Sequence, residues 1–475
     1  MHVRKPLVSF PAARHTQSVD ADVCYRAVRA RDARFDGLFF TAVRSTRIFC
    51  RPVCPAKTPL RRNVEFFSNA AAAQAAGYRP CLRCRPEVSP DAPVWAGTSA
   101  TIQRALRLID QGALDSGSTG ELAERLGLTD RHLRRLFLEH LGIPPIVVAE
   151  SRRTLFAKKL ITETNLPFME IAFASGFASL RRFNEAIRKV YDRNPSQLRR
   201  FLAREPAAAG AIELKLHYRP PFNWDAFIGF IGPRAIPGIE EVTDGEYRLG
   251  EITVRHNPDA NCVVCSIGPS SARNLRRITE RIRFLFDLRA NTQEIAAHLG
   301  KSPILKPMVQ RNAGLRLPGC WDPFEMAVRA ILGQQITVKG ASTLAGRLAA
   351  QLGGIQADVL AEADLGQAGL TKARAESIRA FSRAVAGGSI RFDAGVSSAD
   401  FIAQLCELPG IGPWTANYIA MRCLGDPDAF PASDQGLLRA TGISSPRRLE
   451  ETAEAWRPWR SYAVMYLWES LRRKE

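Results

Sequence analysis

The chain has 475 residues, too many for one compact core, and about 150 residues per domain suggests roughly three or four domains. Hydrophobic residues make up 46% and charged residues 24%, a globular composition that argues against a disordered or fibrous protein. The formal net charge is +19, and residues 1–200 carry most of it, with 33 basic and 18 acidic residues. Such a basic half indicates a polyanionic partner, most simply nucleic acid, although a basic surface alone leaves a merely soluble protein as the alternative.

No apolar run reaches the roughly 18 residues that a membrane span needs. The first residues, Met1–Pro6, lack the apolar segment of a secretory signal. The sequence therefore predicts a cytoplasmic protein, associated with the nucleoid and without a membrane partner.

Four cysteines form two close pairs, Cys50 with Cys54 and Cys81 with Cys84. Two such pairs, each in a tight turn, suit a tetrahedral four-thiolate zinc site. Disulfides and free thiols are the alternatives, and the missing secretory signal disfavours disulfides. We therefore expect one Zn²⁺ held by these four residues. The scattered cysteines are expected in the core: Cys24, Cys262, Cys265, Cys320, Cys406 and Cys423.

The segments around this cluster are Ile48–Pro55, Asn63–Phe67 and Ala76–Pro86. Because of these segments, the region of about residues 18–90 resembles the N-terminal sensor domain of Ada-type adaptive-response proteins. The resemblance implies that the first cysteine, Cys50, irreversibly accepts the methyl group of a methylphosphotriester in the DNA backbone. Zinc binding keeps a thiolate deprotonated, and methylation removes one negative charge, which weakens repulsion from phosphate. An inert zinc module fits the spacing equally well.

The proline-rich stretch Arg85–Pro93 predicts a linker, and after it the periodicity becomes helical. Glu121–Asp130 predicts a helix and a glycine turn, with Thr129 as the N-cap of a second helix. The same arrangement returns about fifty residues later, where Ser179 is the expected N-cap. The arginines expected to contact DNA lie on the two second helices: Arg131, Arg134, Arg135, Arg181 and Arg182.

Two helix-turn-helix units at this spacing can enter successive major grooves on one face of DNA, and a helical bundle with a basic surface is the alternative. Residues 98–202, which close with Tyr191–Leu198, resemble AraC-type transcriptional activators. The resemblance implies binding to promoter DNA, with RNA polymerase as a partner.

A second linker, Arg204–Gly210, precedes strand-like segments at Ile212–Leu216 and Glu251–Val254 and a basic helix, which together predict a small α+β domain.

Further on, Leu408–Ala416 contains Leu-Pro-Gly-x-Gly between helical segments, typical of a helix-hairpin-helix. Its glycines Gly410 and Gly412 are expected to offer backbone N–H groups to a DNA phosphate.

Asp434 lies about twenty residues beyond this hairpin, near the start of another helix. An N-cap is the ordinary role of an aspartate there. The hairpin before it favours a catalytic role instead, because a helix-hairpin-helix followed by an aspartate is the arrangement of base-excision DNA glycosylases.

Residues 211–475 resemble AlkA-type 3-methyladenine-DNA glycosylases along their whole length, in Leu317–Cys320, Ala330–Gln334, Trp414–Tyr418 and Trp456–Ala463. The resemblance implies that Asp434 is the carboxylate that stabilises a positively charged sugar while an alkylated purine leaves. The implied pocket for the flipped base consists of Trp414, Tyr418 and Trp468. Gln335 stands where the family often has a leucine wedge that fills the gap left by the flipped base.

Three absences narrow this hypothesis. Trp414 stands where glycosylases that also cut the backbone have a lysine, so no lyase step is expected. No cysteine follows Cys423, which excludes a C-terminal iron–sulfur loop, and no Pro-Cys-His-Arg sequence supports repair of O6-alkylguanine. The competing hypotheses are a pure transcriptional regulator with an inactive glycosylase half and an RNA-directed enzyme, for which no RNA-binding motif is present.

The predicted fold class is multidomain, mainly α with α+β parts, and the protein is expected to be a monomer. The expected domains are a zinc-binding methyl-acceptor domain (1–92), an all-α double helix-turn-helix domain (98–203), a small α+β domain (211–290) and an all-α helix-hairpin-helix glycosylase domain (291–475).

Overall fold

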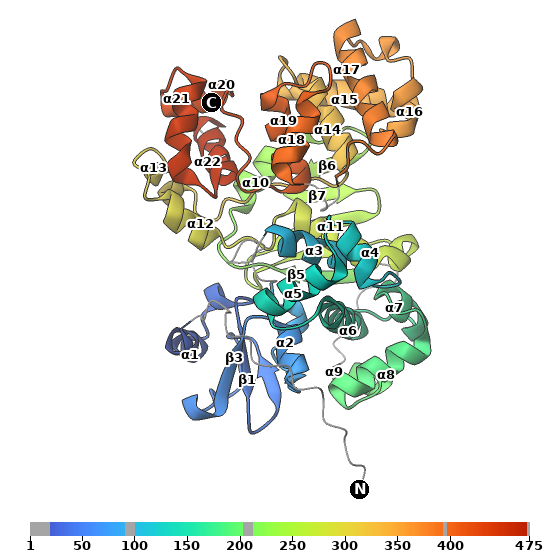
Figure 1. Cartoon of the computed structure of the whole chain (residues 1–475), viewed down its shortest axis with the longest axis vertical. Helices are drawn as coiled ribbons and strands as arrows, with labels where there is room; N and C mark the ends of the chain where they lie inside the picture. The colour runs from blue at the N-terminus through green and yellow to red at the C-terminus, as the bar shows by residue number, and fades with distance from the viewer. Residues whose placement is uncertain (1–19, 91–99, 203–211, 393–396, 473–475) are drawn as a thin grey trace. The chain divides into compact units, whose positions relative to one another are not determined.

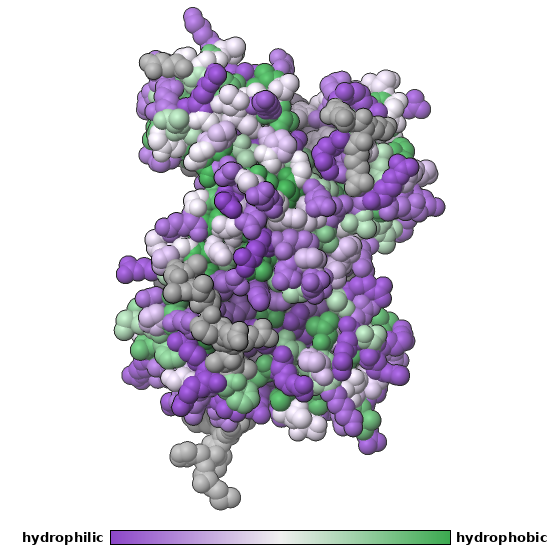
Figure 2. Space-filling model, turned by 180° about the vertical axis from the view of Figure 1, so that it is seen from behind, coloured by the Kyte–Doolittle hydropathy of each residue, from purple (hydrophilic) through white to green (hydrophobic). Residues whose placement is uncertain are grey.

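The computed structural model describes residues 20–90, 100–202, 212–392 and 397–472. The chain divides into two compact units: Met1–Arg219 with Asp259–Glu280, and Pro220–Pro258 with Arg281–Glu475. Helices predominate in both and the sheets are small, which confirms the predicted mainly α, multidomain fold class (Figure 1). Hydrophilic residues cover most of the surface seen in Figure 2, with apolar residues scattered among them. None of the described helices is both long and apolar enough to cross a membrane.

A four-stranded sheet with the order β3-β1-β2-β4 begins the first unit. Strand β1 (Phe40–Val43) pairs antiparallel with β2 (Ile48–Cys50) and β3 (Val64–Phe67), and β2 pairs parallel with β4 (Arg79–Pro80). Helices α1 and α2 and three short 3₁₀ helices accompany the sheet: α1 (Ala21–Ala30), η1 (Ala33–Phe35), η2 (Arg61–Asn63), α2 (Ala70–Ala75) and η3 (Pro86–Val88). Because strand side chains alternate between faces, β1 contributes to one buried cluster, which consists of Phe40, Ala42, Phe49, Ala73 and Tyr78.

Seven helices follow in the first unit: α3 (Ala100–Asp110), α4 (Thr119–Glu124), α5 (Asp130–Leu141), α6 (Pro145–Glu163), α7 (Phe168–Ala174), α8 (Leu180–Tyr191) and α9 (Pro195–Leu202). The longest, α6, contacts α3, α7, α8 and α9. The Thr129 hydroxyl accepts the His132 N–H at 3.3 Å, and the Ser179 hydroxyl accepts the Arg182 N–H at 3.3 Å. Both predicted N-caps, and with them the two helix-turn-helix units, are confirmed.

The prediction of a linker at Arg85–Pro93 is wrong in its described part. Residues 86–90 are buried, and η3 packs against α6. The physical reason is charge pairing, because Arg85 forms an ion pair with Glu163 and Glu87 forms one with Lys158. The rest of that stretch and the second predicted linker, 204–210, lie outside the described residues.

Two strands of the region after residue 211 belong to the first unit. Strand β5 (Ile212–His217) pairs antiparallel with β9 (Cys262–Ile267), so the predicted strand at 212–216 is confirmed.

Five of the six scattered cysteines are buried, as expected. Cys406 is exposed, so its predicted core position is wrong. It ends α18 (Ser398–Cys406) just after the buried Leu405, where the next side chain points away from the core.

In the second unit, strands β6 (Glu240–Thr243), β7 (Glu246–Leu249) and β8 (Ile252–Asn257) form an antiparallel meander. The packing of α19 on α14 and α18, and of α20 on α22, builds the region that carries the predicted pocket residues. The remaining elements in chain order are α10 (Trp224–Ile231), η4 (Gly232–Arg234), η5 (Pro269–Asn274, in the first unit), α11 (Leu275–Leu285, which begins in the first unit), α12 (Thr292–Leu299), α13 (Lys306–Arg311), α14 (Pro323–Leu332), α15 (Val338–Leu352), α16 (Ala357–Glu362), η6 (Gly366–Ala368), α17 (Lys372–Ala386), α19 (Pro413–Ile419), the π-helix η7 (Ala420–Leu424), α20 (Gln435–Thr441), α21 (Pro446–Ala453), η8 (Glu454–Trp456) and α22 (Arg460–Arg472).

Candidate functional site

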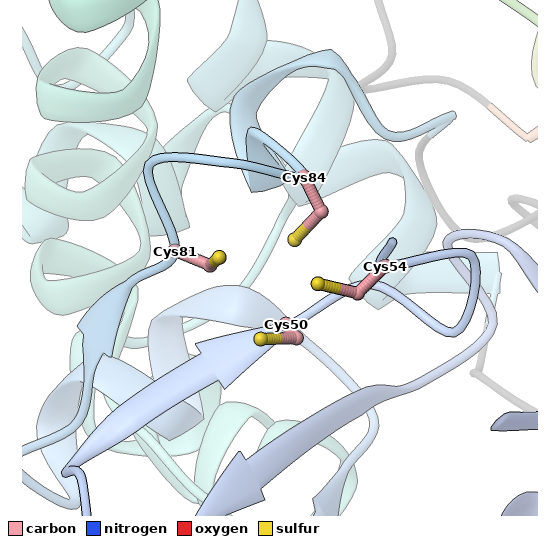
Figure 3. A group of neighbouring side chains, drawn as sticks. All are labelled: Cys50, Cys54, Cys81 and Cys84. Atoms are coloured by element: carbon pink, nitrogen blue, oxygen red, sulfur yellow. The ribbon is translucent and has the colours of Figure 1, made fainter. Parts of the chain in front are cut away.

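Four cysteine side chains converge in the first unit (Figure 3). The Sγ atoms of Cys50, Cys54, Cys81 and Cys84 all lie within 4.8 Å of one another. Cys50 ends β2, and the parallel pairing of β2 with β4 brings Cys81 beside it, where the Cys81 N–H donates to the Phe49 carbonyl oxygen at 2.9 Å. Strand pairing therefore joins two turns that are well separated in the sequence.

The four sulfurs differ in accessibility. Cys81 and Cys84 are buried, whereas Cys50 and Cys54 are partly exposed. Hydrogen bonding with Cys50 lowers the pKa of Cys54 to about 7. The Arg51 N–H lies 3.3 Å from the Cys84 Sγ and supplies a donor to that sulfur. A reactant from solution can thus reach Cys50 or Cys54, while the protein covers the other two.

The cluster fits a zinc ion. In a tetrahedral site with Zn–S distances of about 2.3 Å, the sulfurs are about 3.8 Å apart. This spacing is compatible with the four sulfurs of the cluster, which all lie within 4.8 Å of one another. The nearby Arg51 guanidinium is already paired with Asp36, its Nε lying 2.9 Å from Oδ1. Four cysteine sulfurs at this spacing can hold one cation between them, and the donor set indicates zinc.

The second helices of the two helix-turn-helix units present arginines to solvent. Arg134 and Arg181 form ion pairs within their own helices, with Asp130 at 2.9 Å and Glu185 at 3.0 Å. Exposed pairs of this kind are weak, so a phosphate can replace the carboxylate. All five arginines proposed to contact DNA are exposed: Arg131, Arg134 and Arg135 on α5, and Arg181 and Arg182 on α8.

The two hairpin glycines lie exposed between α18 and α19, and they differ in why glycine is needed. Gly410 has φ +77°, and a Cβ there would lie 2.0 Å from the Ser377 Oγ. Gly412 is the N-cap of α19, and a Cβ there would meet nothing within 4 Å. The packing of the chain therefore requires Gly410, whereas the space in front of Gly412 is open to a ligand.

Asp434 caps α20, since its Oδ1 accepts the Leu437 N–H at 2.9 Å. The same oxygen accepts the Trp468 indole N–H at 3.0 Å, and Oδ2 accepts the Trp414 indole N–H at 2.9 Å. Among the described residues, Asp434 forms no ion pair. The carboxylate is therefore fixed by three neutral donors, and none of the cations that the structure describes forms an ion pair with it.

Aromatic rings surround this carboxylate. The Trp414 and Tyr418 rings are stacked, with centroids 5.4 Å apart and planes at 8°, and the Tyr418 and Trp468 centroids are 6.1 Å apart. Phe230 of α10 stacks on Trp468 at 5.9 Å and 14°. The structure thus brings together the three proposed pocket residues, and it adds Phe230, which sequence analysis missed because it lies far from the others in the chain.

Gln335, the residue at the wedge position, is exposed and has φ +58°. Its neighbour Gln334 donates from Nε2 to the Gly410 carbonyl oxygen and to the Thr415 Oγ1, both at 2.9 Å. The Gln334 carbonyl oxygen accepts from the Arg374 Nη2 at 2.6 Å. The turn that presents Gln335 is therefore fixed to the hairpin, through a residue that sequence analysis did not single out.

Arg422 was also missed. Its Nη1 donates to the Tyr418 hydroxyl at 2.8 Å, and the carbonyl oxygens of Pro318 and Gly319 hold the rest of the buried guanidinium at 2.6 and 3.0 Å. A spacing of four residues from Tyr418 on a helical segment was the available signal. Arg422 therefore orients one ring of the pocket.

Arg422, which holds the Tyr418 hydroxyl, also lines a small cavity. The Arg234 guanidinium, 3.8 Å above the Phe230 ring, lines it together with Arg422. Burial raises the pKa of the Tyr418 hydroxyl, but Arg422, Arg234 and Arg329 outweigh burial, so that this pKa is lowered. The other lining residues are Ile231, Glu240, Tyr247, Leu285, Gly319, Cys320, Trp321, Glu325, Met326 and Arg329.

Four protein-family models match the chain. They are the metal binding domain of Ada (residues 23–87), a helix-turn-helix domain (122–200), the AlkA N-terminal domain (213–322) and the HhH-GPD superfamily of base excision DNA repair proteins (328–458). The order is the one that the sequence resemblances predict.

This chain is similar to one kind of relative over nearly its whole length and to two other kinds over one part only. The "Probable bifunctional transcriptional activator/DNA repair enzyme AlkA" of Mycobacterium tuberculosis is 43% identical over 95% of this chain and 97% of its own length. The "DNA-3-methyladenine glycosylase 2" of Escherichia coli is 34% identical over 53% of this chain and 95% of its own length. The "Bifunctional transcriptional activator/DNA repair enzyme Ada" of Escherichia coli is 43% identical over 26% of this chain and 34% of its own length. The chain therefore belongs to the Ada/AlkA-type family of bifunctional transcriptional activators and DNA repair enzymes, with a glycosylase domain.

Proposed function

We propose that this protein responds to DNA alkylation through two separate reactions, methyl acceptance by Cys50 and hydrolytic release of alkylated purines at Asp434. The observation that carries the proposal is the Asp434 carboxylate held by two indole N–H groups inside an aromatic pocket. The same chain holds a four-sulfur cluster with a partly exposed Cys50. The four domain limits expected from the sequence and a monomeric state belong to this proposal.

In the first reaction, the Cys50 sulfur attacks the methyl carbon of a methylphosphotriester. An S–C bond forms as the C–O bond breaks, and the phosphodiester anion leaves. Cys50, Cys54, Cys81 and Cys84 would hold one zinc ion, which would keep the sulfur deprotonated at neutral pH. The partial exposure of Cys50 supports its role, and the buried Cys81 and Cys84 support purely structural roles.

Methylation of Cys50 removes one negative charge from the cluster. Repulsion from DNA phosphates weakens accordingly, and affinity for DNA rises. The exposed arginines of α5 and α8 then bind promoter DNA, where bound protein recruits RNA polymerase. The sensor of DNA damage would thus also be the activator.

In the second reaction, water replaces the alkylated purine at the sugar carbon. The N-glycosidic bond breaks while positive charge develops on the deoxyribose, and the Asp434 carboxylate stabilises that charge. A cationic base such as 3-methyladenine leaves as a neutral molecule and needs no strong general acid. Trp414 takes the place of the lysine that a lyase step requires, so this enzyme hydrolyses without cutting the backbone.

The aromatic rings bind the flipped base, since electron-rich faces attract a cationic purine. Backbone N–H groups at Gly410 and Gly412 hold a DNA phosphate, which the open space in front of Gly412 supports. Gln335 enters the gap left by the base, in agreement with its exposed position on a fixed turn. The resemblance to a 3-methyladenine-DNA glycosylase supports this class of substrate.

The test uses the full chain and duplex DNA treated with a labelled methylating agent. We expect methyl label on the peptide that contains Cys50, detected by mass spectrometry, and free methylated purines in solution. Label on the protein without base release would indicate a regulator with an inactive glycosylase half. If the protein carries no methyl label and no methylated purine is released, the proposed function is wrong.

A further inference from the structure

Arg85 directly follows the cysteine Cys84 and has an unusual backbone. Its φ is +55°, in the left-handed region that residues other than glycine rarely adopt. The side chain is only 17% exposed and extends to the end of α6, where Nη2 lies 2.5 Å from the Glu163 Oε1 and 3.2 Å from the Thr162 Oγ1. Strained residues persist where their surroundings hold them, and here α6 is what holds Arg85.

Further buried charges join the same turn to α6. Glu87, two residues after Arg85, accepts from the Arg85 Nε at 3.1 Å and pairs with Lys158, and the Glu87 and Lys158 side chains are fully buried. The Lys159 Nζ lies 2.8 Å from the Glu163 Oε2. Two carboxylates and three cations therefore form one continuous network between the cysteine turn and the last turns of α6.

Arg51 holds the turn that carries Cys84 from the other side. Arg51 follows Cys50, and its Nη1 donates to the Cys84 carbonyl oxygen at 3.1 Å while its N–H points at the Cys84 Sγ. The turn that carries Cys84 is thus held between Arg51 and the Arg85 pairs. A change of charge at the cluster acts directly on this turn.

Helix α6 connects this turn to the helices that carry the arginines proposed to contact DNA. It lies between the two helix-turn-helix units in the sequence and packs on α7 and α8 as well as on α3 and α9. Buried ion pairs add little stability compared with an apolar seam of the same size. A purely structural contact would not need five charges, whereas a contact that must hold one fixed orientation is served by directional pairs.

We propose that Arg85 and Glu163 couple the four-cysteine cluster to the recognition helices, the second helices α5 and α8 of the two helix-turn-helix units. The cluster and α8 then bind DNA as one rigid body. This inference rests on the proposed methyl acceptance by Cys50. When methylation raises the DNA affinity of the cluster, the coupled recognition helices share the gain, because linked binding sites reinforce each other. Without the coupling, methylation increases the affinity of the cluster alone.

The experiment compares wild type with Glu163→Gln, before and after methylation by a duplex that carries a methylphosphotriester. Mass spectrometry measures methyl uptake at Cys50, and fluorescence anisotropy measures affinity for an unmodified mixed-sequence duplex of about 40 base pairs, long enough for successive major grooves. The control is Glu65→Gln, which removes the exposed Arg44–Glu65 pair from the same sheet and leaves α6 untouched.

Wild type and Glu65→Gln are expected to gain on the order of tenfold or more in affinity after methylation. Glu163→Gln should take up methyl equally well, bind the duplex as wild type does before methylation, and lose most of the gain. An equal gain in Glu163→Gln would overturn the coupling and leave methyl acceptance standing. Absence of methyl uptake by wild type would instead overturn the proposed function, and the coupling with it.

Removing one buried charge can unfold the protein, which circular dichroism detects. In that case Lys159→Met with Glu163→Gln replaces the single variant, because this pair of substitutions removes one charge of each sign. The same comparison applies, and a full gain of affinity in the double variant would overturn the coupling.

Discussion

Glu163 and Asp434 show two ways of holding a carboxylate. Glu163, beside the cysteine turn of the first unit, faces Arg85 and Lys159 at 2.5 and 2.8 Å. Asp434, in the pocket of the second unit, accepts hydrogen bonds from a backbone amide and two indoles. Cations neutralise the first carboxylate, so it can hold two elements together. Neutral donors fix the second without neutralising it, so its charge stays available for a cationic transition state.

A second pair of carboxylates extends the comparison. Burial opposes ionisation of Glu163, but Lys159 and Arg85 outweigh burial and lower its pKa to about 2. Burial also opposes ionisation of Glu325, and here Arg329 does not compensate, so the pKa of Glu325 rises to about 7. Two cations act on Glu163, whereas one cation and two further carboxylates, Glu240 and Asp322, act on Glu325, so the neighbouring charges decide the direction of the shift.

The largest expected effect separates the two reactions. Replacing Cys50 by Ser should abolish methyl uptake from a methylphosphotriester, because a hydroxyl at neutral pH is not a comparable nucleophile. Release of methylated purines should continue at the wild-type rate. Cys406→Ser, at an exposed cysteine outside the cluster, is the control and should keep both activities. Full methyl uptake by Cys50→Ser would assign the acceptor to another residue.

Asp434→Asn is the corresponding change in the second unit. Asparagine caps helices as well as aspartate does, so α20 should remain folded. Loss of the negative charge should slow base release by about 10²-fold or more, measured in single-turnover assays with methylated duplex DNA. Methyl uptake at Cys50 serves as the internal control. Unchanged base release would show that Asp434 is only a helix cap.

The two indole donors should have smaller effects. Trp468→Phe keeps a ring that can stack on Phe230 but removes the N–H that donates to the Asp434 Oδ1. Trp414→Phe likewise removes the N–H that donates to the Asp434 Oδ2. A hydrogen bond to a charged group contributes about 1.5–3 kcal/mol, so base release should fall about tenfold or more in each variant.

The control for the indole variants is Trp456→Phe, which removes an indole hydrogen bond to the Ser302 Oγ. This variant should lose stability and keep the rate of base release. If Trp414→Phe and Trp468→Phe both release bases as fast as wild type, the indoles do not position the carboxylate for the reaction.

Short-range patterns predicted the parts of the molecule that depend on neighbouring residues. The cysteine spacing identified a metal site that strand pairing then closes, and Thr129 and Ser179 marked the starts of two helices correctly. Proline content failed at Arg85–Pro93 because the partner of Glu87 lies 71 residues further along the chain. Composition indicates a linker there, and only tertiary pairing shows a buried contact.

The pocket shows the same limit. Family resemblance supplied Trp414, Tyr418 and Trp468, and the structure places their rings together. Phe230 and Arg422 complete the pocket; Phe230 carries no local pattern that distinguishes it from an ordinary core residue, and Arg422 is marked only by its spacing of four residues from Tyr418. Long-range contacts of this kind depend on how helices pack, which no spacing in the sequence specifies.

The last expected effect concerns stability and leaves activity unchanged: Glu163 and Glu325 should differ in their pH dependence. Glu325 has a pKa of about 7 when folded, against an ordinary value of 4.5, so the folded state binds its proton more tightly. Its contribution to stability is therefore present below about pH 4.5 and is lost as the pH rises through 7, a change of about 3 kcal/mol. Glu163 has the opposite sign, since its pKa of about 2 gives a contribution that is present above 4.5 and lost only in acid.

Thermal unfolding at about pH 5 and about pH 8 distinguishes the two carboxylates. Glu325→Gln resembles the protonated side chain at every pH, so it should match wild type at the lower pH and be the more stable protein at the higher one. Glu163→Gln should be destabilised by a similar amount at both, because Glu163 is ionised in the folded and largely ionised in the unfolded chain across this range. If Glu325→Gln shows the same difference from wild type at both values, Glu325 is ionised in the folded protein throughout, and the cations around it outweigh its burial as they do at Glu163.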